Sequence, residues 1–169
     1  YEIRPRDWSS DVCSSDLLLT NRIPASVVAR LDACGDVDQF VRDGVDVMPH
    51  DELIGRVVGK HALVCLITDR VDRAVLESGS DLKLVANVGV GFNNIDVAAA
   101  KERGVIVTNT PGVLTDATAD LTWALILGIT RRIGEGERLV RAGQWKGFKF
   151  DFMLGAGLRG KQQIGRAHV

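Results

Sequence analysis

Residues 82–109 constrain the fold most, because they carry the pattern of a strand, a glycine-rich turn, a helix and a second strand. Residues 82–86 form a short apolar run typical of a buried strand. The turn follows at 87–91 as Asn-Val-Gly-Val-Gly, where the two glycines allow positive φ angles and the close approach of another molecule. Such a turn lies at the carboxyl end of its strand, where open α/β sheets bind ligands.

A helix is expected directly after this turn. Asn94 can cap a helix over residues 95–103, and Gly104 supplies the residue that ends it. The β-branched run at 105–107 is then the next buried strand. The whole stretch therefore predicts a βαβ unit with two parallel strands.

The glycine spacing of this turn does not identify its ligand. Gly89 and Gly91 supply a G-x-G, but the third glycine of a dinucleotide fingerprint would fall at position 94, which is Asn94. Two interpretations remain open: a tight βα turn without a ligand, and a turn whose backbone amides bind a carboxylate.

Composition excludes several classes of function. Of the 169 residues, 46% are hydrophobic and 25% are charged, as in an ordinary soluble domain. The formal net charge of -1 gives no electrostatic reason to expect nucleic acid or an anionic membrane surface as a partner. No apolar run has the length of a membrane span. The three cysteines, Cys13, Cys34 and Cys65, lack a C-x-x-C spacing, which indicates a reducing, cytoplasmic compartment.

The two ends of the chain look foreign to the rest. Codons that encode residues 11–17 can be read in reverse complement as residues 163–169, Gln-Ile-Gly-Arg-Ala-His-Val. This antisense match resembles sequencing-adapter read-through into a truncated reading frame. Residues 1–17 are therefore interpreted as a non-native leader and residues 163–169 as a non-native tail, and the native protein is expected to continue past Gln162.

The rest of the chain alternates between strand and helix patterns. This alternation predicts an α/β fold with a flavodoxin-like, doubly wound parallel sheet. Asp72 is expected to cap one of its helices. Further strands are expected at 17–20, 45–47 and 62–67, and further helices at 25–34, 50–58 and 72–78.

The pattern changes after Asn109. A turn at 110–112 is followed by a long helix over 116–132, which Thr115 can cap. The centre of that helix, 119–129, is apolar nearly all round and is expected to be buried against more than one surface. A second helix is expected at 135–142. The aromatic side chains beyond it are expected to pack in a core; they are Trp145, Phe148, Phe150 and Phe152.

A chain of collinear motifs resembles one enzyme family. The segments are NVGVGFNNID at 87–96, VTNTPGVLT at 107–115, TAD at 118–120 and CLITD at 65–69, followed by RAGQW and GKQ further along. They resemble the NAD(P)-dependent D-2-hydroxyacid dehydrogenases, and among these the glyoxylate/hydroxypyruvate reductases. The resemblance spans residues 18–162.

The resemblance implies two domains. Residues 18–109 would be the substrate domain, and residues 110–162 would be the first helices of an incomplete Rossmann domain that binds NAD or NADP. The family's G-x-G-x-x-G turn and its catalytic Arg, Glu and His lie further downstream, so no catalytic residue is assigned and the fragment itself is expected to be inactive. A homodimer of the parent protein is also implied.

The resemblance also assigns binding residues. The backbone N–H groups of Val90 and Gly91 would hold the carboxylate of a small 2-oxo or 2-hydroxy acid, and Leu66 would line its pocket. Thr118 would contact the cofactor. Phe148 matches a position that can reach a neighbouring subunit, although core packing is the favoured interpretation.

The remaining polar residues are given structural roles. Asp69 and Arg70 are interpreted as a solvated pair at the sheet edge. His50 and His61 are interpreted as surface or core histidines, because both lie far from the glycine turn in sequence.

Three alternative functions remain. The chain could come from a non-enzymatic NAD sensor or corepressor on the same scaffold, or from a phosphoglycerate dehydrogenase-like member of the family. It could also be a stand-alone flavodoxin-like or receiver domain that ends near Asn109. A receiver would need an acidic cluster at its strand ends, and the long apolar helix would then have no surface to cover it.

Overall fold

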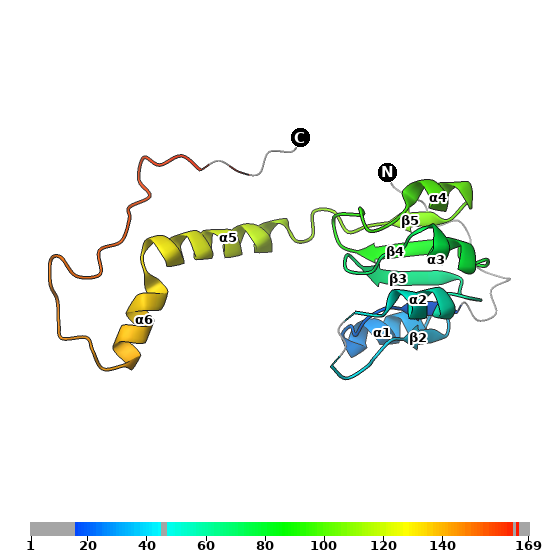
Figure 1. Ribbon diagram of the computed structural model, residues 1–169, viewed down its shortest axis with the longest axis horizontal. Coiled ribbons are helices and arrows are strands. Elements are labelled where there is room, and N and C mark those ends of the chain that lie inside the picture. Colours follow the sequence, from blue (N-terminus) through cyan, green and yellow to red (C-terminus); the bar gives the residue numbers. More distant parts are fainter. Residues whose placement is uncertain (1–15, 45–46, 164, 166–169) are drawn as a thin grey trace. The chain divides into compact units, whose positions relative to one another are not determined.

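A five-stranded parallel sheet forms the core of the first part of the chain (Figure 1). The computed structural model describes residues 16–44, 47–163 and 165. The strand order β2-β1-β3-β4-β5 is that of flavodoxin-like sheets, so the predicted α/β fold is confirmed. The strands are β1 (Leu17–Leu19), β2 (Val37–Gln39), β3 (Ala62–Leu66), β4 (Leu84–Val88) and β5 (Ile106–Thr108). The helices are α1 (Ala25–Asp32), α2 (His50–Arg56), α3 (Arg73–Ser78), α4 (Val97–Glu102), α5 (Thr115–Thr130) and α6 (Ile133–Arg141).

One face of the sheet carries the core. Alternate residues of β3 and β4, such as Leu63, Cys65 and Val85, are buried there, as the period of two along a strand requires. They form one apolar cluster with residues of α2, α3 and α4, which pack side by side. The intervening strand residues are only half-buried, and α1 buries none of its residues. The fold is therefore held mainly by one helix layer.

The first strand begins at Leu17, where the strand over residues 17–20 was predicted to begin. Leu17 is buried in β1 and pairs with Val37 and Ala62 on either side. The backbone carbonyl of Asp16 accepts hydrogen bonds from His61 and Ala62. Residue 17 is thus part of the sheet, whereas residues 1–15 lie outside the described part of the chain, and the non-native leader over residues 1–17 stays a prediction.

The second strand was predicted at the wrong place. Residues 45 and 46 of the predicted strand lie outside the described residues, and Val47 lies in an exposed bend. The strand that pairs with β1 is instead β2, which comes earlier in the chain. Its three residues are half-buried at the edge of the sheet and show no apolar run, so hydrophobic pattern alone could not find it.

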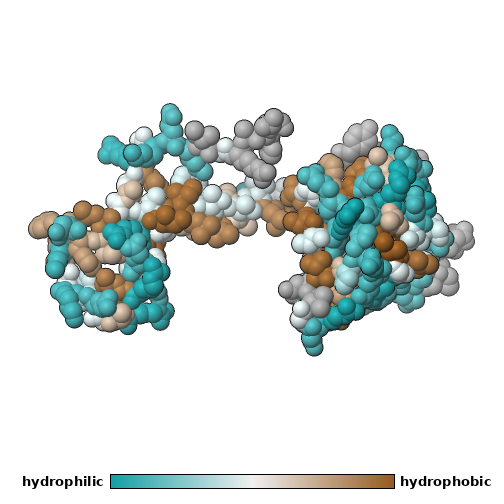
Figure 2. Space-filling view, viewed as in Figure 1, coloured by the Kyte–Doolittle hydropathy of each residue, from teal (hydrophilic) through white to brown (hydrophobic). Residues whose placement is uncertain are grey.

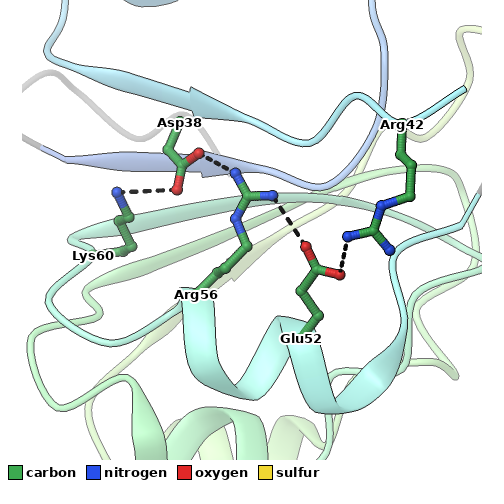
Figure 3. Close-up of polar contacts among 5 residues, drawn as sticks. All are labelled: Asp38, Arg42, Glu52, Arg56 and Lys60. Atoms are coloured by element: carbon green, nitrogen blue, oxygen red, sulfur yellow. Dashed lines mark hydrogen bonds and ion pairs between the residues drawn. The ribbon is translucent and has the colours of Figure 1, made fainter.

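Ion pairs fasten this edge strand to α2 (Figure 3). Arg56 contacts Asp38 of β2 and also lies 3.5 Å from Glu52, while Lys60 lies 3.4 Å from Asp38. Arg42 binds Glu52 at 2.9 Å. The guanidinium groups of Arg42 and Arg56 also lie over the buried ring of Phe40, at 5.2 and 5.7 Å from its centroid, which is the geometry of a cation–π contact.

Two of the three predicted helix caps differ in the structure. The Asp72 side chain accepts a hydrogen bond from the Val75 N–H, so the predicted cap of α3 is confirmed. The side chain that caps α4 is Asp96 rather than Asn94, and it accepts from the Ala99 N–H at 2.9 Å. Thr115 is the first residue of α5, and no side chain caps that helix. Gly104 follows α4 with a φ of 70°, as expected of a residue that ends a helix.

The chain divides into two compact units between Gly112 and Val113. The sheet and all buried residues of the described chain belong to the first unit. The second unit contains α5 and α6, and Figure 2 shows hydrophobic residues on its surface. Leu121, Leu125 and Ile129 of α5 are all more than half exposed. The predicted burial of residues 119–129 is therefore wrong within this chain.

The predicted aromatic core is also absent from the described part of the second unit. Trp145, Phe148, Phe150 and Phe152 are all exposed, and Phe148 contacts Phe150 edge-to-face at 5.3 Å between ring centroids. The prediction failed because an apolar composition shows that a surface is suited to burial but does not identify what covers it. Residues 113–163 do not bury these rings themselves. Among the described residues no helix is long and apolar enough to cross a membrane.

Candidate functional site

The glycine bend at residues 89–91 follows β4 at the carboxyl edge of the sheet. Val90 is 48% exposed, and Gly91 is exposed as well. Within the described chain, the backbone N–H groups of Val90 and Gly91 donate to no other group. Two adjacent amides at the surface can therefore bind an anion from solvent.

The carbonyl groups of the same bend are all engaged. The carbonyl of Gly89 accepts from the Thr110 N–H at 2.9 Å. The Asn109 side-chain amide donates to the Val90 carbonyl at 2.8 Å, and that of Asn87 donates to the Gly91 carbonyl at 2.6 Å. The bend is thus fastened to the sheet through its acceptors, while its donors are left available.

The two glycines play different roles from those predicted. Neither Gly89 nor Gly91 has a positive φ. A Cβ atom on Gly89 would clash with the Cγ2 atom of Ile67, whereas one on Gly91 would meet no atom within 4 Å. Gly89 is needed for close packing against the loop after β3, and Gly91 leaves open space beside the free amides.

Leu66 ends the neighbouring strand β3, next to β4. Its N–H donates to a carboxylate oxygen of Asp69 at 2.7 Å, and its carbonyl accepts from the Asn94 side chain at 3.1 Å. Leu66 therefore lies at the same sheet edge as the glycine bend. Its predicted contact with substrate stays a prediction.

Asp69 is not part of a solvated pair. It is 2% exposed, and it accepts a hydrogen bond from the Thr20 hydroxyl at 2.5 Å. Arg70 instead pairs with Asp72 at 3.1 Å. The sequence interpretation failed because adjacent residues in a tight turn can point in opposite directions, and Asp69 turns back toward β1 and β3.

A chain of polar side chains connects the loops at this edge. Asn94 donates to the carbonyls of Leu66 and Asp69 and also to the Asn87 side-chain oxygen at 3.4 Å. The Cys65 thiol donates to that same Asn87 oxygen at 3.6 Å. Burial, followed by the charge of Asp69, raises the pKa of Cys65 to about 12. Cys65 is therefore a protonated structural thiol rather than a nucleophile.

His50 and His61 have structural positions, as the sequence suggested. His50 begins α2 and lies 3.2 Å from a carboxylate oxygen of Asp72. Burial opposes ionisation of Asp72, but the Val75 N–H, His50 and Arg70 together lower its pKa. His61 accepts a hydrogen bond from the Asp16 N–H at 3.2 Å. Neither histidine makes a hydrogen bond or ion pair with the glycine bend.

The second unit holds the predicted cofactor contact. Thr118 is exposed on α5, and its N–H and carbonyl are used in the helix itself. Phe148 lines a groove of about 350 Å³ beside α6, together with Trp145 and Phe152. The roles assigned to Thr118 and Phe148 stay predictions.

One segment of the second unit has the glycine spacing of a dinucleotide-binding turn but not its structure. Gly155, Gly157 and Gly160 match G-x-G-x-x-G, but residues 154–158 are neither strand nor helix. A Cβ atom on Gly155 would clash with the Thr130 carbonyl oxygen, so this glycine serves packing at the end of α5. The described residues therefore do not form a pyrophosphate-binding turn, and they hold no cluster suited to a metal ion.

Sequence reasoning missed the asparagines that shape the site. Asn87 was seen only as the first residue of the glycine motif, Asn94 was taken for a helix cap, and Asn109 was seen only as part of a family motif. Their common signal is position, because each follows or ends a strand at the carboxyl edge of the sheet. An amide there can donate to a carbonyl and accept from an N–H without carrying charge.

Comparison with known proteins identifies relatives of this chain. The sequence profile of "D-isomer specific 2-hydroxyacid dehydrogenase, catalytic domain" matches residues 17–159. Glyoxylate reductase of Thermofilum pendens is 42% identical over 145 residues, covering 85% of this chain and 42% of that protein. Glyoxylate reductase of Thermococcus litoralis is 41% identical over 149 residues, covering 86% and 44%. The chain thus spans less than half the length of these relatives.

Solved structures agree with the sequence relatives. The TT0316 protein of Thermus thermophilus matches with a TM-score of 0.77 and 41% identity, over 86% of this chain and 46% of that one. A D-isomer specific 2-hydroxyacid dehydrogenase of Polaromonas, described as NAD-binding, matches with the same TM-score and 32% identity, over 87% and 46%. The family match also continues well past Asn109, which contradicts a stand-alone receiver domain. The chain belongs to the D-isomer specific 2-hydroxyacid dehydrogenase family.

Proposed function

We propose that the chain is the substrate-binding part of an oxidoreductase that reduces glyoxylate or hydroxypyruvate to the 2-hydroxy acid with NADH or NADPH. The observation that carries this proposal is the pair of unused N–H groups at Val90 and Gly91. Relatives above 40% identity that are named glyoxylate reductases support the choice of substrate.

The proposed role of the bend is to bind and orient the substrate. The two amides hold the carboxylate, and backbone donors at a fixed position bind an anion without a charged side chain. Leu66 forms an apolar wall on the neighbouring strand end. A reduced nicotinamide supplies the hydride in this chemistry.

Other features of the parent protein belong to the same proposal. We expect it to act in the cytoplasm, which is supported by Cys34 and Cys65 being free thiols. We also expect a homodimer, since the apolar residues of α5 need a covering surface. A net charge of -1 gives no support to a nucleic-acid partner.

Binding is tested by nuclear magnetic resonance on the isotope-labelled chain. Glyoxylate is expected to shift the amide signals of Val90 and Gly91 more than those elsewhere in the sheet. Glycolaldehyde, which is of similar size but lacks the carboxylate, is expected to leave them in place. Equal shifts with both compounds, or none with glyoxylate, would contradict the proposal.

The chain of 169 residues is expected to show no glyoxylate-dependent oxidation of NADH or NADPH. Its described residues form no dinucleotide turn, and neither His50 nor His61 makes a hydrogen bond or ion pair with the bend. The absorbance of the reduced nicotinamide measures this directly. Turnover by this chain alone would show that the catalytic groups lie within it and would overturn this prediction.

A further inference from the structure

We propose that Asn109 is a positioning residue for the carboxylate site, and that its side-chain amide sets the direction of the Gly91 N–H. This inference rests on the proposed function of the bend. It assigns a role to a residue outside the glycine motif, at the end of the neighbouring strand β5.

The argument begins with the peptide group between Val90 and Gly91. That group contains the Val90 carbonyl and the Gly91 N–H, and the described chain has no cis peptide bond. In a planar trans peptide the carbonyl and the N–H point in opposite directions. Asn109 binds the Val90 carbonyl at 2.8 Å, so it turns the Gly91 N–H away from β5 and toward solvent.

The preceding peptide group is fixed from the same segment. The Thr110 N–H donates to the Gly89 carbonyl at 2.9 Å, and this carbonyl shares its peptide group with the Val90 N–H. Both amides that are proposed to bind the carboxylate are thus directed by residues 109–110. The segment is well placed to do so, because β4 and β5 pair in register up to Ala86 and Thr108.

Asn87 fixes the far end of the bend. It is buried, and its amide donates to the Gly91 carbonyl at 2.6 Å. Asn94 and Cys65 in turn donate to the Asn87 oxygen, which sets the orientation of its amide. With one end held by Asn87, a single further hydrogen bond at the Val90 carbonyl suffices to orient the middle of the bend.

The hydrogen bond from Asn109 also strengthens the donor. A hydrogen bond to a carbonyl polarises its peptide group, and connected hydrogen bonds reinforce one another. The path runs from the Asn109 amide through the Val90 carbonyl to the Gly91 N–H and then to the ligand. Asn109 acts only through the backbone and need not touch the substrate.

The test compares Asn109→Ala with Asn93→Ala in the labelled chain. Asn93 is exposed in the same loop and makes no hydrogen bond with a described residue, so it is the matched control. Asn109 is half-buried, and its replacement is not expected to prevent folding. Asn87 is less suitable, because its loss would leave a cavity in the buried network.

Two measurements are made on each variant. Without ligand, the heteronuclear NOE of the Gly91 amide is expected to fall in Asn109→Ala, while the amide shifts of β3 and β4 stay unchanged. With glyoxylate, the dissociation constant is expected to rise about five-fold, the loss of one hydrogen bond of about 1 kcal/mol. Asn93→Ala is expected to match the unaltered chain in both.

The outcomes separate the two proposals. If glyoxylate shifts Val90 and Gly91 in the unaltered chain but binds equally well to Asn109→Ala, the role of Asn109 is wrong and the carboxylate site stands. If glyoxylate fails to shift these amides in the unaltered chain, both proposals are overturned. A loss in Asn93→Ala equal to that in Asn109→Ala would also overturn the assignment.

Discussion

Two side-chain amides, the buried Asn87 and the half-buried Asn94, hold the loops at the carboxyl edge of this sheet. Asn87 and Asn94 donate hydrogen bonds to three backbone carbonyls, one in the glycine bend and two at the end of β3 and in the turn after it, and add no charge beside the bend. A lysine or arginine in their place would bring a charge that burial opposes. Among the described residues of this network the one carboxylate, Asp69, points toward Thr20 and the Leu66 N–H.

Gly89→Ala is expected to destabilise the fold by about 1–3 kcal/mol, because the added methyl group clashes with a branched side chain. The affected atom is Ile67 Cγ2, and β-branching restricts the χ1 rotation that would move this methyl group away. Urea denaturation followed by circular dichroism measures the free energy of unfolding. Gly91→Ala is the control and is expected to change it by less than about 0.5 kcal/mol, since its Cβ meets nothing. Equal effects of the two substitutions would contradict this account of the bend.

Cys65 is expected to resist alkylation in the folded protein. Its pKa is raised to about 12 by burial and then by Asp69, so almost no thiolate exists near neutral pH. Cys34 is exposed and serves as the internal control. Iodoacetamide labelling followed by peptide mass spectrometry should modify Cys34 within minutes, and Cys65 only after denaturation. Labelling of both at the same rate in the folded chain would show that the core around Cys65 opens readily.

Among the elements, β2 depends most on charge. Its residues are half-buried, it pairs only with β1 among the described strands, and Asp38 binds Arg56 and Lys60. Burial opposes ionisation of Asp38, but Arg56 and then Lys60 outweigh it and lower the pKa. A carboxylate with a lowered pKa stabilises the fold at neutral pH, and this contribution is lost as the pH falls below the ordinary value of 3.8.

Asp38→Asn is therefore expected to cost about 0.5–1 kcal/mol at neutral pH and low salt. The difference from the unaltered chain should shrink below about pH 4 and at about 1 M salt, where the ion pairs are neutralised or screened. Urea denaturation at each condition measures it. Asp36→Asn is the control, because Asp36 is exposed and forms no ion pair with a described residue. A difference that persists unchanged at low pH would point to packing rather than charge.

Elements with strong apolar patterns were predictable and the others were not. β3 and β4 were found within two residues because their runs are buried on a helix-covered face. β2 was misplaced because an edge strand held by ion pairs has no such run. Asp96 rather than Asn94 caps α4, because the Asn94 side chain donates to the Leu66 carbonyl at the end of β3. This is a tertiary contact, which the local sequence pattern does not predict. At the site, the exposed bend was predictable, but its hydrogen bond from Asn109 depends on the pairing of β4 with β5. Its hydrogen bond from Asn87 depends on the contacts of Asn94 and Cys65 that orient the Asn87 amide.

At the scale of the whole molecule, the two units have unequal cores. Every buried residue among those described precedes Gly112, whereas α5 and α6 have none. Hydrophobic burial is the main source of folding free energy, so the first unit should resist local opening far better than the second.

Limited proteolysis of the intact chain is expected to cut first beyond Gly112. Trypsin has sites on both sides of this boundary, including Arg103 before it and Arg131 and Arg141 after it. Mass spectrometry of the early products should show a persistent fragment that contains the sheet. Early cleavage at Arg103, the residue that caps the C-terminus of α4, would show instead that the first unit opens as readily as the second.

The positions of the tryptophans determine which unit a fluorescence measurement of unfolding reports on. Trp123 and Trp145 both belong to the second unit and are exposed, while Trp8 lies outside the described residues. No tryptophan lies among the described residues of the sheet unit. Indole emission from Trp123 and Trp145 will therefore report on the unit that buries no described side chain. A melting curve recorded from this emission would not detect the unfolding of the sheet.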